Sequence, residues 1–297
     1  MCFSISARLR PLSNDDFNVI RHKLLYPPFP PNTVLYYGSP IRTIFEKSKL
    51  FYCGIPKNSH TQFLALACTA ELNLRYENFH KNPFAVYFTE ECKKSYKTAP
   101  EYLLDEKLES IWNSDEWHKL VIVRHPLERF ISGYLDICLR QRHKCYACGH
   151  DIHCFARHTY QTMTGIIQHQ IKFEHRDFST NHFYPQSWYC EFSNIVEPER
   201  YPNIGRFTIL KYNKSTEFKQ LVRKVLLEFG FPRRLIYSGW GNNGSDSFLQ
   251  PSTAHASSAH DFNYRLKQII DNSTTLNYIH QTYAIDYMNF GFDFVYQ

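Results

Sequence analysis

The sequence lacks any run of roughly 20 apolar residues, the length that a membrane-spanning helix needs. Its first residues, Met1 to Arg8, contain no apolar stretch of the kind found in a secretory signal. We therefore expect either a cytosolic protein or a chain whose targeting segment lies outside this sequence. Also missing are internal repeats and any lysine or arginine run dense enough to follow a nucleic-acid backbone. Nucleic acid is accordingly not an expected partner.

The chain contains enough apolar residues for a folded core. Of its 297 residues, 43% are apolar, and the net charge of +6 favours an anionic ligand. The proline cluster at 27–31 excludes a helix interior or a central strand there. No linker separates two independent parts. We therefore predict an N-terminal arm over residues 1–45 and a single domain over residues 46–297.

Nine cysteines are present, and five of them lie in one middle stretch: Cys138, Cys145, Cys148, Cys154 and Cys190. This density is unusual for a reduced cytosolic enzyme. Three glycosylation sequons, which begin at Asn213, Asn243 and Asn272, also favour the secretory lumen. The cysteines and histidines of 145–154 offer enough ligands for zinc, but such a site would be cramped. Disulfides are the alternative there, and the sequence does not define their connectivity.

Three short apolar runs are each followed by a helical pattern, which predicts a central parallel α/β sheet flanked by helices. The runs are 50–55, which breaks at Pro56, 119–124 and 206–212. Helical spacing of apolar residues follows the first run from Phe63 to Leu74 and the second from Leu127 to Cys138. The helix after the third run is expected to end at Gly230. Further helices are expected over 159–172 and beyond Asp261, with a loop or lid over 238–258.

Lys57 follows the first predicted strand, in a loop that leads into the start of a helix. Backbone N–H groups at a helix start point outward with the positive end of the helix dipole, so this loop is a candidate anion site. The full pattern G-x-x-x-x-G-K-[ST] is absent, and no magnesium-ligand pattern accompanies Lys57, which argues against a phosphate-loop kinase. The alternative interpretation is a solvated lysine in an ordinary turn.

Arg124 ends the second predicted strand, and Ser132 lies in the helix that follows it. An arginine at the carboxyl end of a strand is well placed for a ligand of an open α/β sheet, and its planar guanidinium suits a phosphate. A serine two turns into the next helix can reach the same anion. The alternative is an ion pair between Arg124 and Glu128, with the serine packed on the helix surface.

Four segments carry a family resemblance. Residues 121–134 contain R-H-P-x-x-R-x-x-S-x-Y, and residues 55–61 place a lysine before small and hydroxyl residues. Residues 181–190 contain H-F-x-P-Q before a cysteine, and residues 287–292 close with F-G-F. These segments resemble, in the same order, motifs of the Golgi carbohydrate sulfotransferases, and most closely a large carbohydrate-sulfotransferase-like set found in nematodes.

The resemblance implies a P-loop-like sulfotransferase fold that binds 3′-phosphoadenosine 5′-phosphosulfate. It implies transfer of the sulfuryl group to a hydroxyl of a glycan or proteoglycan, with no metal. It also implies disulfides in the cysteine-rich stretch and an enzyme of the Golgi lumen, whose type II membrane anchor is not visible in this chain.

The same resemblance assigns roles to individual residues. Lys57 would stabilise the 5′-phosphate as it leaves, and Arg124 and Ser132 would bind the 3′-phosphate. The 5′-phosphate would be held by the residues that follow the lysine: Asn58, Ser59, His60 and Thr61.

An acceptor hydroxyl also needs a base, and histidine titrates nearest to the working pH. His182 is our first choice because it lies in a motif-matched segment, although a histidine among aromatic residues can be purely structural. Glu90, Glu91 and His60 are the other candidates. Ser59 and His60 depart from the residues usual in the family's loop. Together with the anchor that is not visible in this chain, these departures favour an alternative hypothesis, a catalytically impaired relative that acts as a binding or scaffold protein.

Overall fold

The computed structural model describes residues 42–75, 90–95, 97–98, 110–111, 113–168, 178–189, 206–213, 215–233, 236 and 258–294. These residues form two compact units, each built from segments far apart in the sequence. The sheet unit comprises the described residues of 42–124 and 189–236, and the helical unit comprises those of 125–188 and 258–294. The single domain predicted for residues 46–297 stays a prediction.

The sheet unit is built on five strands in the order β3-β1-β2-β4-β5. They are β1 Arg42–Phe45, β2 Leu50–Cys53, β3 Lys97–Thr98, β4 His118–Arg124 and β5 Thr208–Tyr212. Strands β2, β4 and β5 are parallel, as predicted, and their register pairs Cys53 with Val121 and Arg124 with Tyr212. Their carboxyl ends therefore share one edge of the sheet.

Strand β1 is antiparallel to both β2 and β3, an arrangement that the sequence did not predict. Because β1 occupies Arg42–Phe45, the sheet begins inside the segment predicted as an arm. Residues 1–41 of that arm lie outside the described residues.

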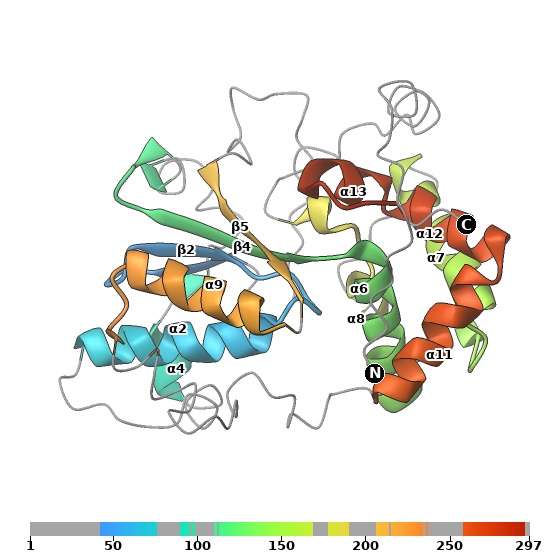
Figure 1. Ribbon diagram of the computed structural model, residues 1–297, viewed down its shortest axis with the longest axis horizontal. Coiled ribbons are helices and arrows are strands. Elements are labelled where there is room, and N and C mark those ends of the chain that lie inside the picture. The colour runs from blue at the N-terminus through green and yellow to red at the C-terminus, as the bar shows by residue number, and fades with distance from the viewer. Residues whose placement is uncertain are drawn as a thin grey trace. The chain divides into compact units, whose positions relative to one another are not determined.

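Helices α2 (His60–Arg75) and α9 (Thr216–Glu228) lie on the same face of the sheet, as Figure 1 shows. Alternate strand residues point to opposite faces, so Leu50, Leu120 and Leu210 join the two helices in one core. The predicted end of α9 is confirmed, because Gly230 adopts a left-handed φ of 75°.

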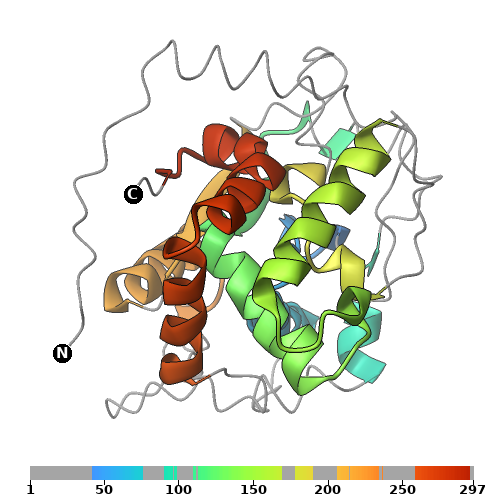
Figure 2. The ribbon, with the colours of Figure 1, turned by 90° about the vertical axis from the view of Figure 1, so that its right-hand side faces the viewer.

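The helical unit begins with α6 (Pro126–Gly133), which continues as a π-helix over Tyr134–Arg140. Its other elements are the 3-10 helix Cys145–Ala147, α7 Ile152–Ile167, α8 Phe178–Asn181, the 3-10 helix Gln186–Trp188, α11 Ala259–Ile270, α12 Ser273–Thr282 and α13 Ala284–Phe290. Within this unit α7 packs along α12, and α11 packs against α6 and α7 (Figure 2).

Two expectations for this unit need correction. The helix predicted over 159–172 starts earlier, at Ile152, because Asp151 caps it by accepting hydrogen bonds from the backbone N–H groups of His153 and Cys154. The helical tail consists of three helices, with Ser258 and Asn272 as side-chain caps of α11 and α12. Most of the loop predicted over 238–258 lies outside the described residues.

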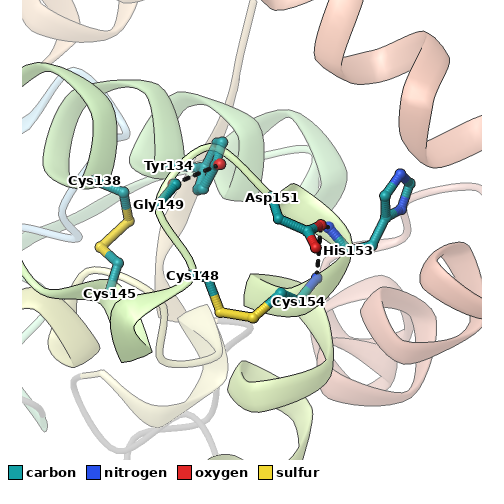
Figure 3. Close-up of a disulfide and its surroundings, with 8 residues drawn as sticks. All are labelled: Tyr134, Cys138, Cys145, Cys148, Gly149, Asp151, His153 and Cys154. Carbon is teal, nitrogen blue, oxygen red and sulfur yellow. Dashed lines mark hydrogen bonds between the residues drawn. A yellow bond between two sulfur atoms is a disulfide. The ribbon is translucent and has the colours of Figure 1, made fainter.

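Two disulfides, Cys138–Cys145 and Cys148–Cys154, cross-link the cysteine-rich stretch (Figure 3). They confirm the disulfide prediction for these four cysteines, whereas Cys190 lies outside the described residues. The sulfurs of Cys148 and Cys154 also lie within 4.8 Å of a ring nitrogen of His158. Because the two sulfurs are bonded to each other, they offer no thiolate pair to a metal in this state.

A third disulfide, Cys68–Cys92, joins α2 to α4 (Glu90–Ser95) and was not predicted. Cys53 is disulfide-bonded as well. In the part of the chain that the structure describes, no helix combines the length and the apolar character needed to cross a bilayer.

Candidate anion-binding site

The loop that carries Lys57 is a tight turn at the carboxyl end of β2. The backbone N–H of Asn58 donates to the carbonyl of Ile55 at 3.3 Å, with Pro56 in the second position and Lys57 in the third. Lys57 has a left-handed φ of 69°. Proline followed by a positive φ is typical of a type II turn, whose third position favours glycine. Lys57 therefore occupies a position where glycine would be less strained.

Asn58 anchors this turn to the neighbouring strand. Its side chain is fully buried, and Nδ2 donates to the carbonyl of Ile122 in β4 at 2.9 Å. The N–H of Asn58 was expected to face an anion, but it closes the turn instead. Asn58 thus fixes the position of Lys57 relative to β4.

The first turn of α2 follows directly. Its first backbone hydrogen bond runs from the N–H of Phe63 to the carbonyl of Ser59 at 2.9 Å, so Ser59 is the residue before the helix. The hydroxyl of Ser59 donates to the side chain of Gln62. This S-x-x-Q spacing is a helix-start signal that was visible in the sequence and was missed. The exposed Thr61 belongs to the same first turn, where backbone N–H groups have no partner within the helix.

His60 does not project from the loop. Its side chain is only 6% exposed, and its ring stacks on Tyr52 of β2 with 5.7 Å between ring centroids. An imidazole that crowds the loop was one of the features that favoured the impaired-relative hypothesis. Because the ring is buried, this feature no longer supports the hypothesis, and the other described residues do not support it either.

Arg124 links the ends of all three parallel strands. It is the last residue of β4 and is 5% exposed. Its Nη1 donates to the carbonyl of Lys57 at 3.5 Å, and its guanidinium lies 5.1 Å from the ring centroid of Tyr212 in β5. Tyr212 was not among the predicted site residues, although it is the last residue of a predicted strand.

The sheet unit thus brings two cationic residues, Lys57 and Arg124, to one edge of the sheet, beside the start of a helix. Both the side-chain charges and the helix dipole favour an anion at this edge. This arrangement suits a phosphate or sulfate group.

The remaining predicted site residues of the helical unit lie on two elements. Ser132 is half-buried in α6. His182 is half-buried in the turn after α8, and its carbonyl accepts a hydrogen bond from Nη2 of Arg129 at 3.1 Å.

The alternative bases Glu90 and Glu91 begin α4 on the surface of the sheet unit. Glu90 accepts a hydrogen bond from Lys93 at 2.6 Å, and this contact lowers the pKa of the Glu90 carboxyl. A carboxylate held by a lysine is a weaker base, which makes Glu90 less suited to take the proton of an acceptor hydroxyl.

The parallel strands and the helices beside them give the chain an α/β fold, a class in which ligands often bind where parallel strands end. The chain belongs to the sulfotransferase family, whose sequence profile matches residues 42–293. This match confirms the α/β sulfotransferase fold expected from the sequence.

Two proteins of Caenorhabditis elegans are among its relatives. "Carbohydrate sulfotransferase chst-1" is 23% identical over 265 residues, which cover 84% of this chain and 74% of that protein. "Putative sulfotransferase vep-2" is 25% identical over 162 residues, which cover 52% of this chain and 49% of that protein. The chain therefore spans about half the length of vep-2. No solved structure matches the chain significantly.

Proposed function

We propose that this sulfotransferase moves the sulfuryl group of 3′-phosphoadenosine 5′-phosphosulfate to a hydroxyl group of a glycan. The observation that carries the proposal is the placement of Lys57 and Arg124 at the carboxyl edge of β2 and β4. The glycan acceptor is supported by the relative chst-1, which is named as a carbohydrate sulfotransferase.

The donor carries two phosphate groups, and each needs cationic partners. In the proposal, Lys57 binds the 5′-phosphosulfate together with the first turn of α2, including the Thr61 hydroxyl. Arg124 binds the 3′-phosphate, and Ser132 adds a hydroxyl, since α6 follows directly after the strand that Arg124 ends. The planar guanidinium can donate two parallel hydrogen bonds to phosphate oxygens.

The reaction is an in-line displacement at sulfur. A bond forms between the acceptor oxygen and sulfur, while the bond between sulfur and the 5′-phosphate oxygen breaks. Negative charge builds on that phosphate oxygen, and the ammonium group of Lys57 stabilises it. The proton of the acceptor hydroxyl passes to the imidazole of His182. These residues supply the charge and the base that the step needs without a metal.

We further propose that the protein acts in the lumen of the Golgi on a proteoglycan or another glycan. Three disulfides within the described residues support an oxidising compartment.

A transfer assay tests the proposed function. The purified protein is incubated with the donor carrying a radiolabelled sulfuryl group and with a panel of desulfated glycosaminoglycans and N-glycans. We expect label in at least one glycan, and a loss of at least ~100-fold in rate for Lys57→Ala because the leaving phosphate loses its cation. The control is Lys224→Ala, which removes an exposed lysine of α9 and should leave the rate unchanged. Equal rates for the two variants would contradict the role of Lys57.

A further inference from the structure

The backbone of residues 182–187, which carries the proposed base, is held by side chains from other elements of the helical unit. Three successive carbonyls accept side-chain hydrogen bonds. Arg129 of α6 donates to the carbonyls of His182 and Tyr184 at 3.1 and 2.7 Å, through its two terminal nitrogens. The hydroxyl of Tyr283 donates to the carbonyl between them, that of Phe183, at 2.8 Å.

The next part of the segment is held through its N–H groups. The carboxylate of Asp286 in α13 accepts from the backbone N–H groups of Gln186 and Ser187, both at 2.7 Å. It also accepts from the Ser187 hydroxyl at 2.6 Å. Asp286 is fully buried, and burial raises the pKa of its carboxyl. The hydrogen bonds from Ser187 and Gln186 and the charge of Arg129 act in the opposite direction and favour the charged form.

Aromatic packing also holds residues 182–187 in place. The ring of Phe183 lies against Phe155, with 4.7 Å between ring centroids, and against Phe130 at 5.8 Å. A Cβ atom at Gly133 would lie 2.7 Å from the Phe183 ring, so any larger residue there would force this buried ring to move. His182 itself stays half-buried. The backbone is thus held tightly, while His182 as a residue is not fully buried.

Burying a charged side chain costs free energy because the charge loses its hydration. Arg129 is 1% exposed and Asp286 is 0% exposed, so both charges lose most of their hydration. Apolar residues of similar volume often stabilise a fold as well as a buried ion pair or better. Arg129 and Asp286 each bond two backbone groups and so fix the geometry of the backbone. A catalytic side chain must be positioned to within a fraction of an ångström.

We infer that Arg129 and Asp286 are positioning residues, which hold the backbone of 182–187 so that the His182 imidazole meets the acceptor hydroxyl. This inference rests on the proposed sulfuryl transfer and adds two residues to its machinery. Neither residue touches the reacting atoms. Both act through His182.

The test is a double-mutant cycle with Asp286→Asn and His182→Ala. The asparagine amide would present an N–H group towards the N–H donors of Gln186 and Ser187, which loosens the segment at nearly constant volume. We expect Asp286→Asn to lower kcat about 10- to 100-fold, with little change in the affinity for 3′-phosphoadenosine 5′-phosphate. In the His182→Ala background, the same substitution should lower kcat no further, because the base that it positions is gone.

Arg129→Lys gives a second variant, since a lysine cannot donate to the carbonyls of His182 and Tyr184 with a fork. It should show the same loss and the same dependence on His182. The matched control is Asp136→Asn, another buried carboxylate of the helical unit, which pairs with Arg140. It should change the free energy of unfolding but leave kcat within about twofold.

The measured rates distinguish a failure of the positioning role from a failure of the proposed sulfuryl transfer. An inactive wild-type protein would overturn both. With an active wild type, losses that are additive with His182→Ala, or full activity in Asp286→Asn and Arg129→Lys, would overturn the positioning role alone. Each rate is divided by the fraction of protein that binds 3′-phosphoadenosine 5′-phosphate, so that misfolded protein does not count as lost catalysis.

Discussion

At position 57 the backbone conformation favours glycine, whereas the proposed function requires the charge of a lysine. Its φ of 69° lies in the region that favours glycine, where another residue costs about 1–2 kcal/mol. Its ammonium group supplies a charge that glycine lacks. Strain of this kind persists where the surrounding structure enforces it and is concentrated at functional sites. Here the turn hydrogen bond of Asn58 and its contact with Ile122 provide that enforcement.

This conflict predicts that stability and activity separate at position 57. Lys57→Gly and Lys57→Ala both remove the charge, and both should abolish transfer. Only glycine relieves the left-handed conformation, so Lys57→Gly should unfold with a free energy about 1 kcal/mol higher than Lys57→Ala. Urea denaturation of the two variants measures the difference. Equal stability would mean that the turn is not strained at this residue.

The buried environment of His280 predicts that the stability of the protein depends on pH. Its ring packs edge-on against Tyr287 and Phe294, with 5.6 and 5.2 Å between ring centroids. Burial, and to a smaller extent the charge of the neighbouring His125, lowers the pKa of His280 to about 4. In the unfolded chain the pKa of a histidine is about 6.5.

Between these two pKa values, the unfolded chain binds a proton that the folded protein does not. Stability should therefore fall as the pH drops from about 6.5 to 4, by about 2 kcal/mol at pH 5 from this residue alone. His280→Gln should lose that much less stability between pH 7.5 and pH 5 than the wild type, as measured by urea denaturation. His260→Gln is the control, because His260 is exposed. Identical pH dependence in the wild type and His280→Gln would refute the assignment.

At the scale of elements, the disulfide Cys68–Cys92 links α2, which follows the Lys57 turn, to α4. Both cysteines are fully buried in the core of the sheet unit. The disulfide closes a longer stretch of chain than Cys148–Cys154, with sequence separations of 24 and 6. In the chain-entropy view, a longer loop restricts the unfolded state more.

Removing these disulfides should therefore have unequal effects. We expect the double alanine variant of Cys68 and Cys92 to lose about 3 kcal/mol of stability, and that of Cys148 and Cys154 about 2 kcal/mol. Denaturation under identical conditions compares the two. A larger loss for the shorter loop would show that native packing, and not chain entropy, dominates.

Some elements could be predicted because their signals are local. The apolar spacing from Leu127 to Cys138 identified one helix, and Pro126 marked its start. The change to a π-helix at Tyr134 could not be predicted from that spacing. Gly133 is explained by the Phe183 ring, which comes from a distant part of the sequence. Likewise, β1 was missed because its partners β2 and β3 decide its structure, and its four residues carry little signal of their own.

At the scale of the whole molecule, the sequence predicted the parallel strands and the two cationic residues of their shared edge. It could not predict which side chains hold the Lys57 turn and the backbone that carries His182. Asn58 and Arg129 lie in segments singled out from the sequence. That Asn58, Arg129 and Asp286 hold backbone groups far along the chain follows only from the hydrogen bonds of the folded structure.

The proposed function requires the chain to bind a nucleotide with two phosphate groups through Lys57 and Arg124. Calorimetric titration with 3′-phosphoadenosine 5′-phosphate tests it most directly. We expect saturable binding of one nucleotide per chain, weakened about 10- to 100-fold in Arg124→Ala because a charged hydrogen-bonding partner is lost. Lys57→Ala should keep most of the affinity, and adenosine 5′-phosphate, which lacks the 3′-phosphate, should bind the wild type and Arg124→Ala alike. Absence of nucleotide binding by the wild-type protein would contradict the proposed function.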